Sequence, residues 1–113
     1  MEFTYRSARL RKELSDAEAM DRAYGERAKP LRLRLGVLAE ASHLGDVPTG
    51  TPAHCHPLKH GSRKGQFAVT LRANWRLVFQ PDHNPLPVLA SGELDLTKVT
   101  IIELIEIVDY HDE

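Results

Sequence analysis

Apolar residues alternate with polar ones most regularly near the C-terminus, in the segment "VTIIELIEIVDYH" at 99–111. A side-chain period of two is typical of a β-strand, and successive side chains then point to opposite faces of the sheet. One face is expected to carry Thr100, Ile102, Leu104, Glu106, Val108 and Tyr110, and the other Ile101, Glu103, Ile105, Ile107, Asp109 and His111. Because both faces are largely apolar, the pattern predicts a central strand.

Three other segments have strand-like patterns. "EFTY" at 2–5 predicts a short leading strand, and the β-rich runs 66–71 and 75–80 predict two more. The three residues "RAN" between those runs are short enough for a hairpin turn, with Asn74 in the left-handed conformation. The Pro-rich segment 81–98 is longer than a hairpin needs, so we expect it to form an exposed excursion.

The segment 7–25 instead has apolar residues at helical spacing. Ser15 followed by Glu18 fits a capping box. A helix is therefore expected to start afresh near Asp16 and to end at Gly25, a residue type that often follows a helix C-terminus.

A second helix is predicted from about Lys29, with Pro30 tolerated in its first turn. Leu31, Leu35 and Leu38 then form one apolar face, although the letters "LRLRL" would alternate equally well as a strand. Two helices joined by a short turn make an αα-hairpin. The expected fold is α+β: a small antiparallel sheet with an N-terminal helical hairpin on one face, in the order β-α-α-β-β-β.

The composition is that of an ordinary globular protein, with 113 residues, 42% hydrophobic and 27% charged. This length suits one core, so we expect a single domain over residues 1–113. No apolar run approaches the roughly 20 residues that a membrane span needs. The first residues have no secretory h-region, and the single Cys55 fits a reducing compartment. We therefore expect a cytoplasmic protein that does not bind membranes.

Charge is distributed unevenly along the chain. Residues 54–81 carry five Lys and Arg and no acid, whereas residues 82–113 carry one lysine and eight acids. A purely basic stretch in a nearly neutral protein indicates a polyanionic partner, with a solvated Lys- and Arg-rich loop as the alternative. The acidic segment is expected partly in solvent and partly paired with the basic one.

The basic stretch opens with "HCHPLKHGSRKGQF", which raises the question of zinc. His54 and His56 alternate and would share a face of a strand, as a metal requires. Cys55 would then point away, there is no second cysteine, and the flanking cations would repel Zn²⁺. Lysine, arginine and loop glycines suit a phosphate better, so we expect no metal and no other cofactor.

Two further segments carry candidate chemistry. In "NWRLVF", Trp75 is expected in the core, and stacking on a nucleic-acid base is the alternative. Arg76 is expected on the opposite face, where it needs a carboxylate or a phosphate as its partner. At the C-terminus, His111 could act as an acid or base, since imidazole titrates near neutrality, and Asp109 could orient it. A frayed polar tail is the simpler interpretation of that end.

Taken together, "HPLKHGSRKGQFAVTLRANWRLVF" and a terminal "EIVDYH" resemble the HigB branch of the RelE/ParE toxin superfamily. The resemblance covers roughly 54–80 and 104–111, with the blocks in the family's order. It implies a RelE-like toxin domain that cleaves mRNA on the ribosome and is held inactive by a HigA-type helix-turn-helix antitoxin. The matching active-site positions are His56, Arg76, Asp109, Tyr110 and His111. The positions expected to contact RNA are Lys59, Arg63, Lys64 and Arg72.

This sequence departs from the family pattern at two places. His60 is an extra residue in the basic loop, and the 81–98 excursion is longer than in compact members, as in a long-chain, killer-suppression-type subgroup. Two other functions stay open: a ParE-type inhibitor of DNA gyrase, and a catalytically inactive member that binds only RNA or an antitoxin. The basic region 59–76 is the expected docking surface for an antitoxin.

Cleavage of RNA without a metal needs a base for the 2′-OH proton, an acid for the 5′-oxygen and a cation for the phosphoryl oxygens. His56 and His111 can supply the acid and base pair, and Arg76 a fixed cation with fork geometry. Asp109 can orient an imidazole or serve as the base. Tyr110 is expected on the other face, binding a base or packing locally.

Overall fold

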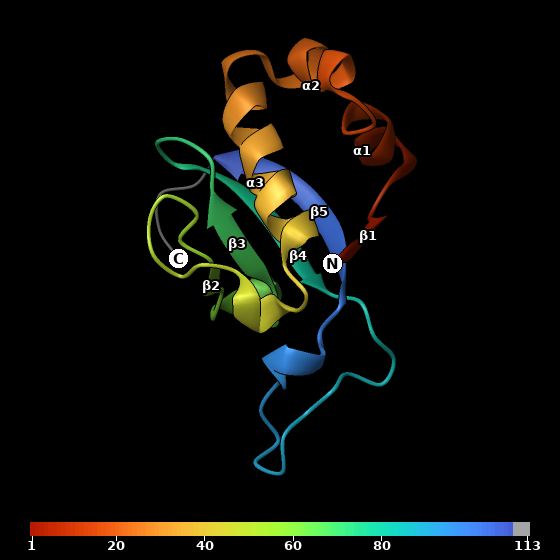
Figure 1. Ribbon diagram of the computed structural model, residues 1–113, viewed down its shortest axis with the longest axis vertical. Coiled ribbons are helices and arrows are strands. Elements are labelled where there is room, and N and C mark those ends of the chain that lie inside the picture. The colour runs from red at the N-terminus through yellow and green to blue at the C-terminus, as the bar shows by residue number, and fades with distance from the viewer. Residues whose placement is uncertain (110–113) are drawn as a thin grey trace.

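The computed structural model describes residues 1–109 as an α+β fold with helices on one side of a single sheet (Figure 1). Its helices and strands are β1 (Glu2–Tyr5), α1 (Ala8–Glu13), α2 (Ala17–Tyr24), α3 (Ala28–Glu40), β2 (His56–Pro57), β3 (Phe67–Thr70), β4 (Trp75–Pro81) and β5 (Ile101–Asp109). Four short 3₁₀ turns connect them: η1 (Gly25–Arg27), η2 (Leu44–Asp46), η3 (Gly61–Arg63) and η4 (Leu96–Lys98). The predicted fold class and the helical hairpin of α2 and α3 are confirmed.

The sheet has five strands in the order β1-β5-β4-β3-β2. Neighbours are antiparallel except β1 and β5, which run parallel. The sheet is therefore mixed, a departure from the antiparallel sheet expected from the sequence, because the leading strand joins at the far side of β5. The two-residue β2 was not predicted and forms the opposite edge. β5 lies between β1 and β4, which confirms that the C-terminal segment forms a central strand.

The first helical segment is interrupted between α1 and α2. The Asp16 carboxylate accepts a hydrogen bond of 2.8 Å from the Ala19 amide and caps α2, while the Ser15 hydroxyl donates to the Lys12 carbonyl at 2.8 Å. The helix starts near Asp16 as predicted, but the predicted capping box at Ser15 is wrong. Ser15 is used to close the end of α1, and an aspartate is at least as good an N-cap as a serine.

Helix α3 supplies the apolar face that covers the sheet, and Figure 1 shows it lying across β3, β4 and β5. Leu31 and Leu38 are fully buried and Leu35 is 9% exposed, as the helical spacing predicted. Pro30 lies in the first turn of the helix. The main core forms between this face and one side of the sheet, with Phe79, Ile102 and Leu104 among its members.

A β-bulge interrupts the pairing of β4 with β5. Phe79 is opposite Leu104 but its neighbour Val78 is opposite Glu106, so Ile105 is an extra residue on β5. One extra residue reverses the alternation beyond it. Ile107 therefore packs against the main core together with Leu104, while Ile105 and Val108 pack in a small cluster with Val78. The faces predicted for this strand are thus correct before Ile105 and wrong after it.

The β3–β4 turn takes its left-handed residue at Ala73, with φ 48°, and not at Asn74 as predicted. The Trp75 amide donates to the Arg72 carbonyl at 2.9 Å, and the Leu71 amide donates to the Trp75 carbonyl at 2.9 Å. This closing geometry determines which turn residue must have a positive φ.

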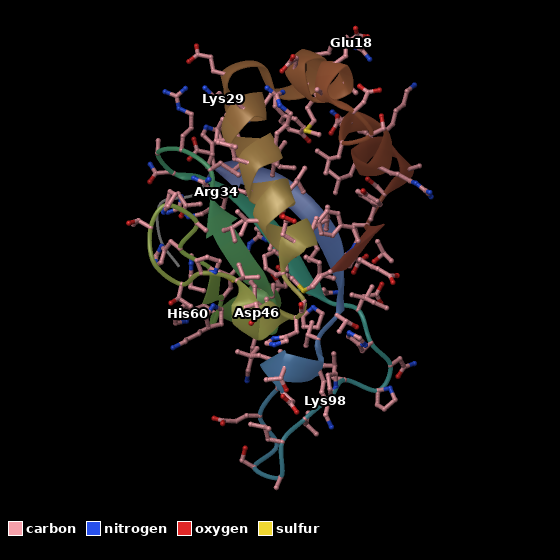
Figure 2. All side chains as sticks on the ribbon, viewed as in Figure 1. Glu18, Lys29, Arg34, Asp46, His60 and Lys98 are labelled. Carbon is pink, nitrogen blue, oxygen red and sulfur yellow. The ribbon has the colours of Figure 1, made fainter. Side chains whose placement is uncertain are left out.

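The segment 82–98 projects away from the sheet, at the bottom of the view in Figure 1, where Lys98 marks its return in Figure 2. A single β-bridge between Val88 and Leu94 holds its two arms together. Leu86, Val88 and Leu89 are 46–57% exposed, which confirms the predicted exposed excursion. In residues 1–109, no helix has the length and apolar character needed to cross a membrane.

Candidate functional site

The face of the sheet opposite α3 brings together side chains from four strands. His56 in β2 is opposite Ala68 in β3, Ala68 is opposite Val78 in β4, and Val78 is opposite Glu106 in β5. Directly opposed residues of neighbouring strands point to the same face. Ala68 and Val78 belong to a small cluster separate from the main core. This row, from His56 to Glu106, therefore lies on the side of the sheet away from α3.

A neighbouring row on the same face contains Arg76. Arg76 is opposite Thr70 on one side and Val108 on the other, and Val108 packs with the small cluster. With strands about 4.8 Å apart and a rise of about 3.4 Å per residue, the Cα atoms of His56 and Arg76 are about 12 Å apart. Side chains of this length can both reach a phosphate placed between them.

The His56 ring is oriented by its own backbone neighbourhood. Its Nδ1 lies 2.9 Å from the His54 carbonyl oxygen, and its ring stacks on that of His54 with centroids 4.6 Å apart. A carbonyl only accepts, so Nδ1 must carry the hydrogen. The neutral imidazole then has its lone pair on Nε2, which is the form a general base needs.

Arg76 is held at the end of the sheet. Its Nη1 donates to the Ala73 carbonyl at 3.0 Å and to the Trp75 carbonyl at 3.3 Å. These bonds to the β3–β4 turn limit the rotation of the guanidinium. A fixed cation of this kind suits the stabilisation of developing charge on a phosphoryl group.

Of the residues predicted to contact RNA, three lie in the basic loop after β2. Lys59 and Lys64 are exposed, and Arg63 is partly buried. Arg63 Nη2 donates to Glu106 Oε2 at 2.5 Å, and Arg63 Nη1 donates to Gln66 Oε1 at 3.3 Å. The loop thus has a lysine on either side of an arginine that is engaged with the sheet.

The fourth predicted RNA contact, Arg72, lies apart from this loop, in the β3–β4 turn. It forms an ion pair of 3.0 Å with Glu26 of η1. Beside it, the Arg27 guanidinium lies 3.8 Å from the centre of the Trp75 ring, and Trp75 packs against the main core. Trp75 is therefore partly buried at the margin of the core, which agrees only in part with the core position predicted for it.

Asp109 is exposed at the end of β5, opposite Trp75. By register it belongs to the face that carries α3, one position beyond the row that contains Arg76. The structure therefore groups His56, Arg63 and Arg76 on one face and places Asp109 at the adjoining strand end. Tyr110 and His111, the other two predicted catalytic residues, lie outside the described residues.

His54, Cys55 and His56, which were considered as zinc ligands from the sequence, make packing contacts in the structure. Cys55 is buried, and burial raises the pKa of its thiol to about 11. The His54 and His56 rings are stacked on each other. Within residues 1–109, no three His, Cys, Asp or Glu side chains come together as a metal site would require.

Two charged residues with structural contacts were not singled out from the sequence. In the structure Glu106 lies in the same row as His56. The alternation of the sequence instead predicted Glu106 on the face of Leu104, because no sequence feature indicates the bulge at Ile105. Arg34, which is labelled in Figure 2, is 8% exposed. Its Nε donates to the Thr70 carbonyl at 2.7 Å and so joins α3 to the end of β3. An arginine between two leucines of an apolar helix face is the only signal for that contact.

Among solved structures, a chain described as a YoeB/ParE toxin from Agrobacterium tumefaciens is similar to this one. The match has a TM-score of 0.53 and 14% identity, and it covers 98% of this chain and 100% of that chain. A scan against protein-family models finds no match, and neither does a search of curated proteins. The chain therefore has the fold of a YoeB/ParE toxin, which agrees with the RelE-like fold predicted from the motifs. The assignment to the HigB branch stays a prediction.

Proposed function

We propose that this chain is the toxin of a type II toxin–antitoxin pair and a HigB-like, ribosome-dependent mRNA endoribonuclease. The observation that carries the proposal is the shared face of His56 and Arg76, which come from two different sequence blocks. An imidazole that can take or give a proton and a guanidinium held by turn carbonyls are two of the three groups that metal-independent RNA cleavage needs.

In the proposed reaction, a base removes the proton of the ribose 2′-OH, and the 2′-oxygen attacks the adjacent phosphorus. The bond to the 5′-oxygen breaks, an acid protonates that oxygen, and a 2′,3′-cyclic phosphate remains. His56 Nε2 can take or give a proton, and Arg76 stabilises the charge on the phosphoryl oxygens. Asp109, Tyr110 and His111 are proposed to complete the acid–base set. Lys59, Lys64 and Arg72 are proposed to contact the RNA backbone, with no metal or other cofactor required.

The proposed partners are the ribosome with its mRNA, and a HigA-type helix-turn-helix antitoxin that docks on the basic region 59–76. Residues 54–81 carry no acid, so a partner with an acidic segment would associate rapidly and with a strong dependence on salt. A target on translating ribosomes requires a cytoplasmic protein.

Translation of a defined mRNA in a reconstituted system tests the proposal, with primer extension to map any cuts. Wild-type protein should cut the mRNA only when ribosomes are present. His56→Ala and Arg76→Ala should each lower the cleavage rate by about 10²-fold or more. His60→Ala is the matched control, because it removes an exposed imidazole four residues from His56 and should leave the rate unchanged. Equal rates for His56→Ala and wild type would remove His56 from the mechanism.

The fold match to a chain described as a YoeB/ParE toxin keeps gyrase inhibition as the second candidate. A supercoiling assay with purified gyrase separates the two: inhibition at stoichiometric protein, without mRNA cleavage, would replace the nuclease proposal. This chain can also be expressed in cells that lack the antitoxin. If the cells keep growing, the result would favour a catalytically inactive protein that only binds RNA or an antitoxin.

A further inference from the structure

The basic loop between β2 and β3 has few attachments of its own. Its backbone hydrogen bonds are local: Leu58 donates to Gln66, Arg63 to His60 and Lys64 to Gly61. Gly61 and Gly65 both have positive φ values, of 59° and 92°, and nothing lies within 4 Å of a Cβ built on either one. Such a loop can close on itself, but these bonds do not determine where it lies relative to the sheet.

One described side-chain contact crosses from this loop to the central strand. Arg63 in η3 forms a 2.5 Å ion pair with Glu106 in β5. The loop starts from β2, and β3 and β4 lie between β2 and β5. The loop ends at β3, so its two ends lie three and two strand spacings of about 4.8 Å from β5, or about 14 and 10 Å. The contact between Arg63 and Glu106 therefore passes over β4 and joins the loop to this face of the sheet.

Burial beneath the loop supports this crossing. Leu58, at the start of the loop, is 4% exposed and packs with Ala68 and Val78, which are both fully buried. Ala68 and Val78 are the two residues that stand between His56 and Glu106 in their row. The loop is therefore held at one end by apolar contact and across the sheet by the ion pair.

We propose that Glu106 is a positioning residue, whose ion pair with Arg63 straps the basic loop across the sheet face beside His56 and Arg76. In this proposal the ion pair determines where Lys59 and Lys64 meet the RNA backbone. The role of Glu106 therefore rests on the proposed function, and it adds Glu106 to the residues of that site. Arg63 then acts through Glu106 and not as a direct phosphate ligand, which revises the role predicted for it from the sequence.

The same strand offers a matched control three residues away. Glu103 lies on the same face of β5 and forms an ion pair of 3.0 Å with Arg6, and Gln80 also donates to it at 2.8 Å. This pair joins β5 to the residue that follows β1, and no contact between it and the basic loop is found in residues 1–109, although the charge of Glu106 also acts on Arg6. Glu103→Gln therefore removes a carboxylate from the same face of β5 and leaves both Arg63 and Glu106 in place.

Charge reversal tests whether the pair acts by position. Arg63→Glu and Glu106→Arg should each raise KM for ribosome-bound mRNA about 10-fold with a small change in kcat, because the loop lysines are displaced. The double variant restores an ion pair with its charges exchanged, and its KM should return to within about threefold of wild type. A double variant no better than the worse single variant would overturn the strap and assign Arg63 to direct phosphate contact.

A second comparison separates the strap from catalysis by Glu106 itself. Glu106→Gln keeps the shape of the side chain and removes its charge, so the strap predicts a raised KM and an unchanged pH profile of kcat. A fall in kcat together with loss of the acidic limb of that profile would make Glu106 a general base and overturn the strap. Circular dichroism of each variant establishes that the fold is retained.

Limited trypsin digestion gives a readout that does not depend on nuclease activity. Trypsin can cut this loop after Lys59, Arg63 and Lys64. Glu106→Gln should speed the cuts after the two lysines about fivefold, whereas Glu103→Gln should not. If wild-type protein cleaves no mRNA, the proposed function fails, yet this comparison still decides whether the strap exists. Equal digestion of wild type and Glu106→Gln would overturn it.

Discussion

Helix α3 should depend on Leu38 far more than on Leu33, although the two leucines are five residues apart in the same helix. Leu38 is 0% exposed and lies in the main core, whereas Leu33 is 56% exposed. Replacing either leucine with alanine removes the same three carbons. The comparison therefore isolates the effect of burial from the chemistry of the substitution.

The expected loss at Leu38 can be estimated from burial. Each buried carbon contributes about 0.8 kcal/mol, so the removed part of the side chain accounts for roughly 2.4 kcal/mol of the free energy of unfolding. The cavity left between α3 and the sheet adds to this, giving about 3–4 kcal/mol in all. Leu33→Ala loses about 1 kcal/mol at most, because over half of that side chain is already in water and alanine is the better helix former.

Equilibrium unfolding in urea, followed by circular dichroism at 222 nm, measures both variants. With a denaturant slope near 1.5 kcal/mol per molar, Leu38→Ala should lower the midpoint by about 2 M and Leu33→Ala by less than about 0.7 M. Since domains of this size have total stabilities of about 5–15 kcal/mol, both variants should still fold in water. Equal midpoint shifts would mean that α3 presents a different face to the sheet, and the helix–sheet packing described above would be refuted.

Three smaller effects follow from local contacts. The hydrogen bond from Arg6 lowers the pKa of Glu103 below its ordinary value of 4.5, so this pair stabilises the fold above that pH and the stabilisation is lost as the pH falls through the lowered pKa. Glu103→Gln should therefore lower the free energy of unfolding by about 0.2–1 kcal/mol at pH 7 in urea unfolding. A difference that does not shrink as the pH is lowered stepwise from 4.5 would contradict the assignment. Asp16→Ala should lower the free energy of unfolding by about 0.5–2 kcal/mol and Ser15→Ala by less than about 0.5 kcal/mol, because Asp16 caps α2. A larger loss for Ser15→Ala than for Asp16→Ala in thermal melts would support the predicted capping box at Ser15. Ala73→Gly should raise stability by about 0.5–1 kcal/mol, because a left-handed φ strains alanine and not glycine; a lower urea midpoint would rule out that strain.

The element types of this protein could be predicted from local patterns. The alternation in 99–111 predicted the central strand, and the leucine spacing of 31–38 predicted the buried face of α3. Both patterns reflect backbone geometry within a few residues, a period of two for a strand and 3.6 for a helix. Two residues of the candidate site could also be picked out from the sequence, because His56 lies in the "HPL" block and Arg76 in the "NWR" block.

The grouping of those residues depended on contacts between distant segments. The bulge at Ile105 reverses which side chains of β5 share a face, and nothing in the local sequence indicates it. It moves Glu106 into the row of His56, where Glu106 meets Arg63 from a loop 43 positions away. The parallel pairing of β1 with β5 likewise joins the two ends of the fold.

The sequence by itself therefore determined which helices and strands form and which chemical groups are available. Only the tertiary structure decided which groups meet, because strand order, register and a one-residue bulge are set by packing across the whole sheet. An alternation pattern holds along a strand only while the pairing is regular, and a single inserted residue exchanges its two faces. For this protein, that exchange decides which carboxylate of β5 lies beside the basic loop.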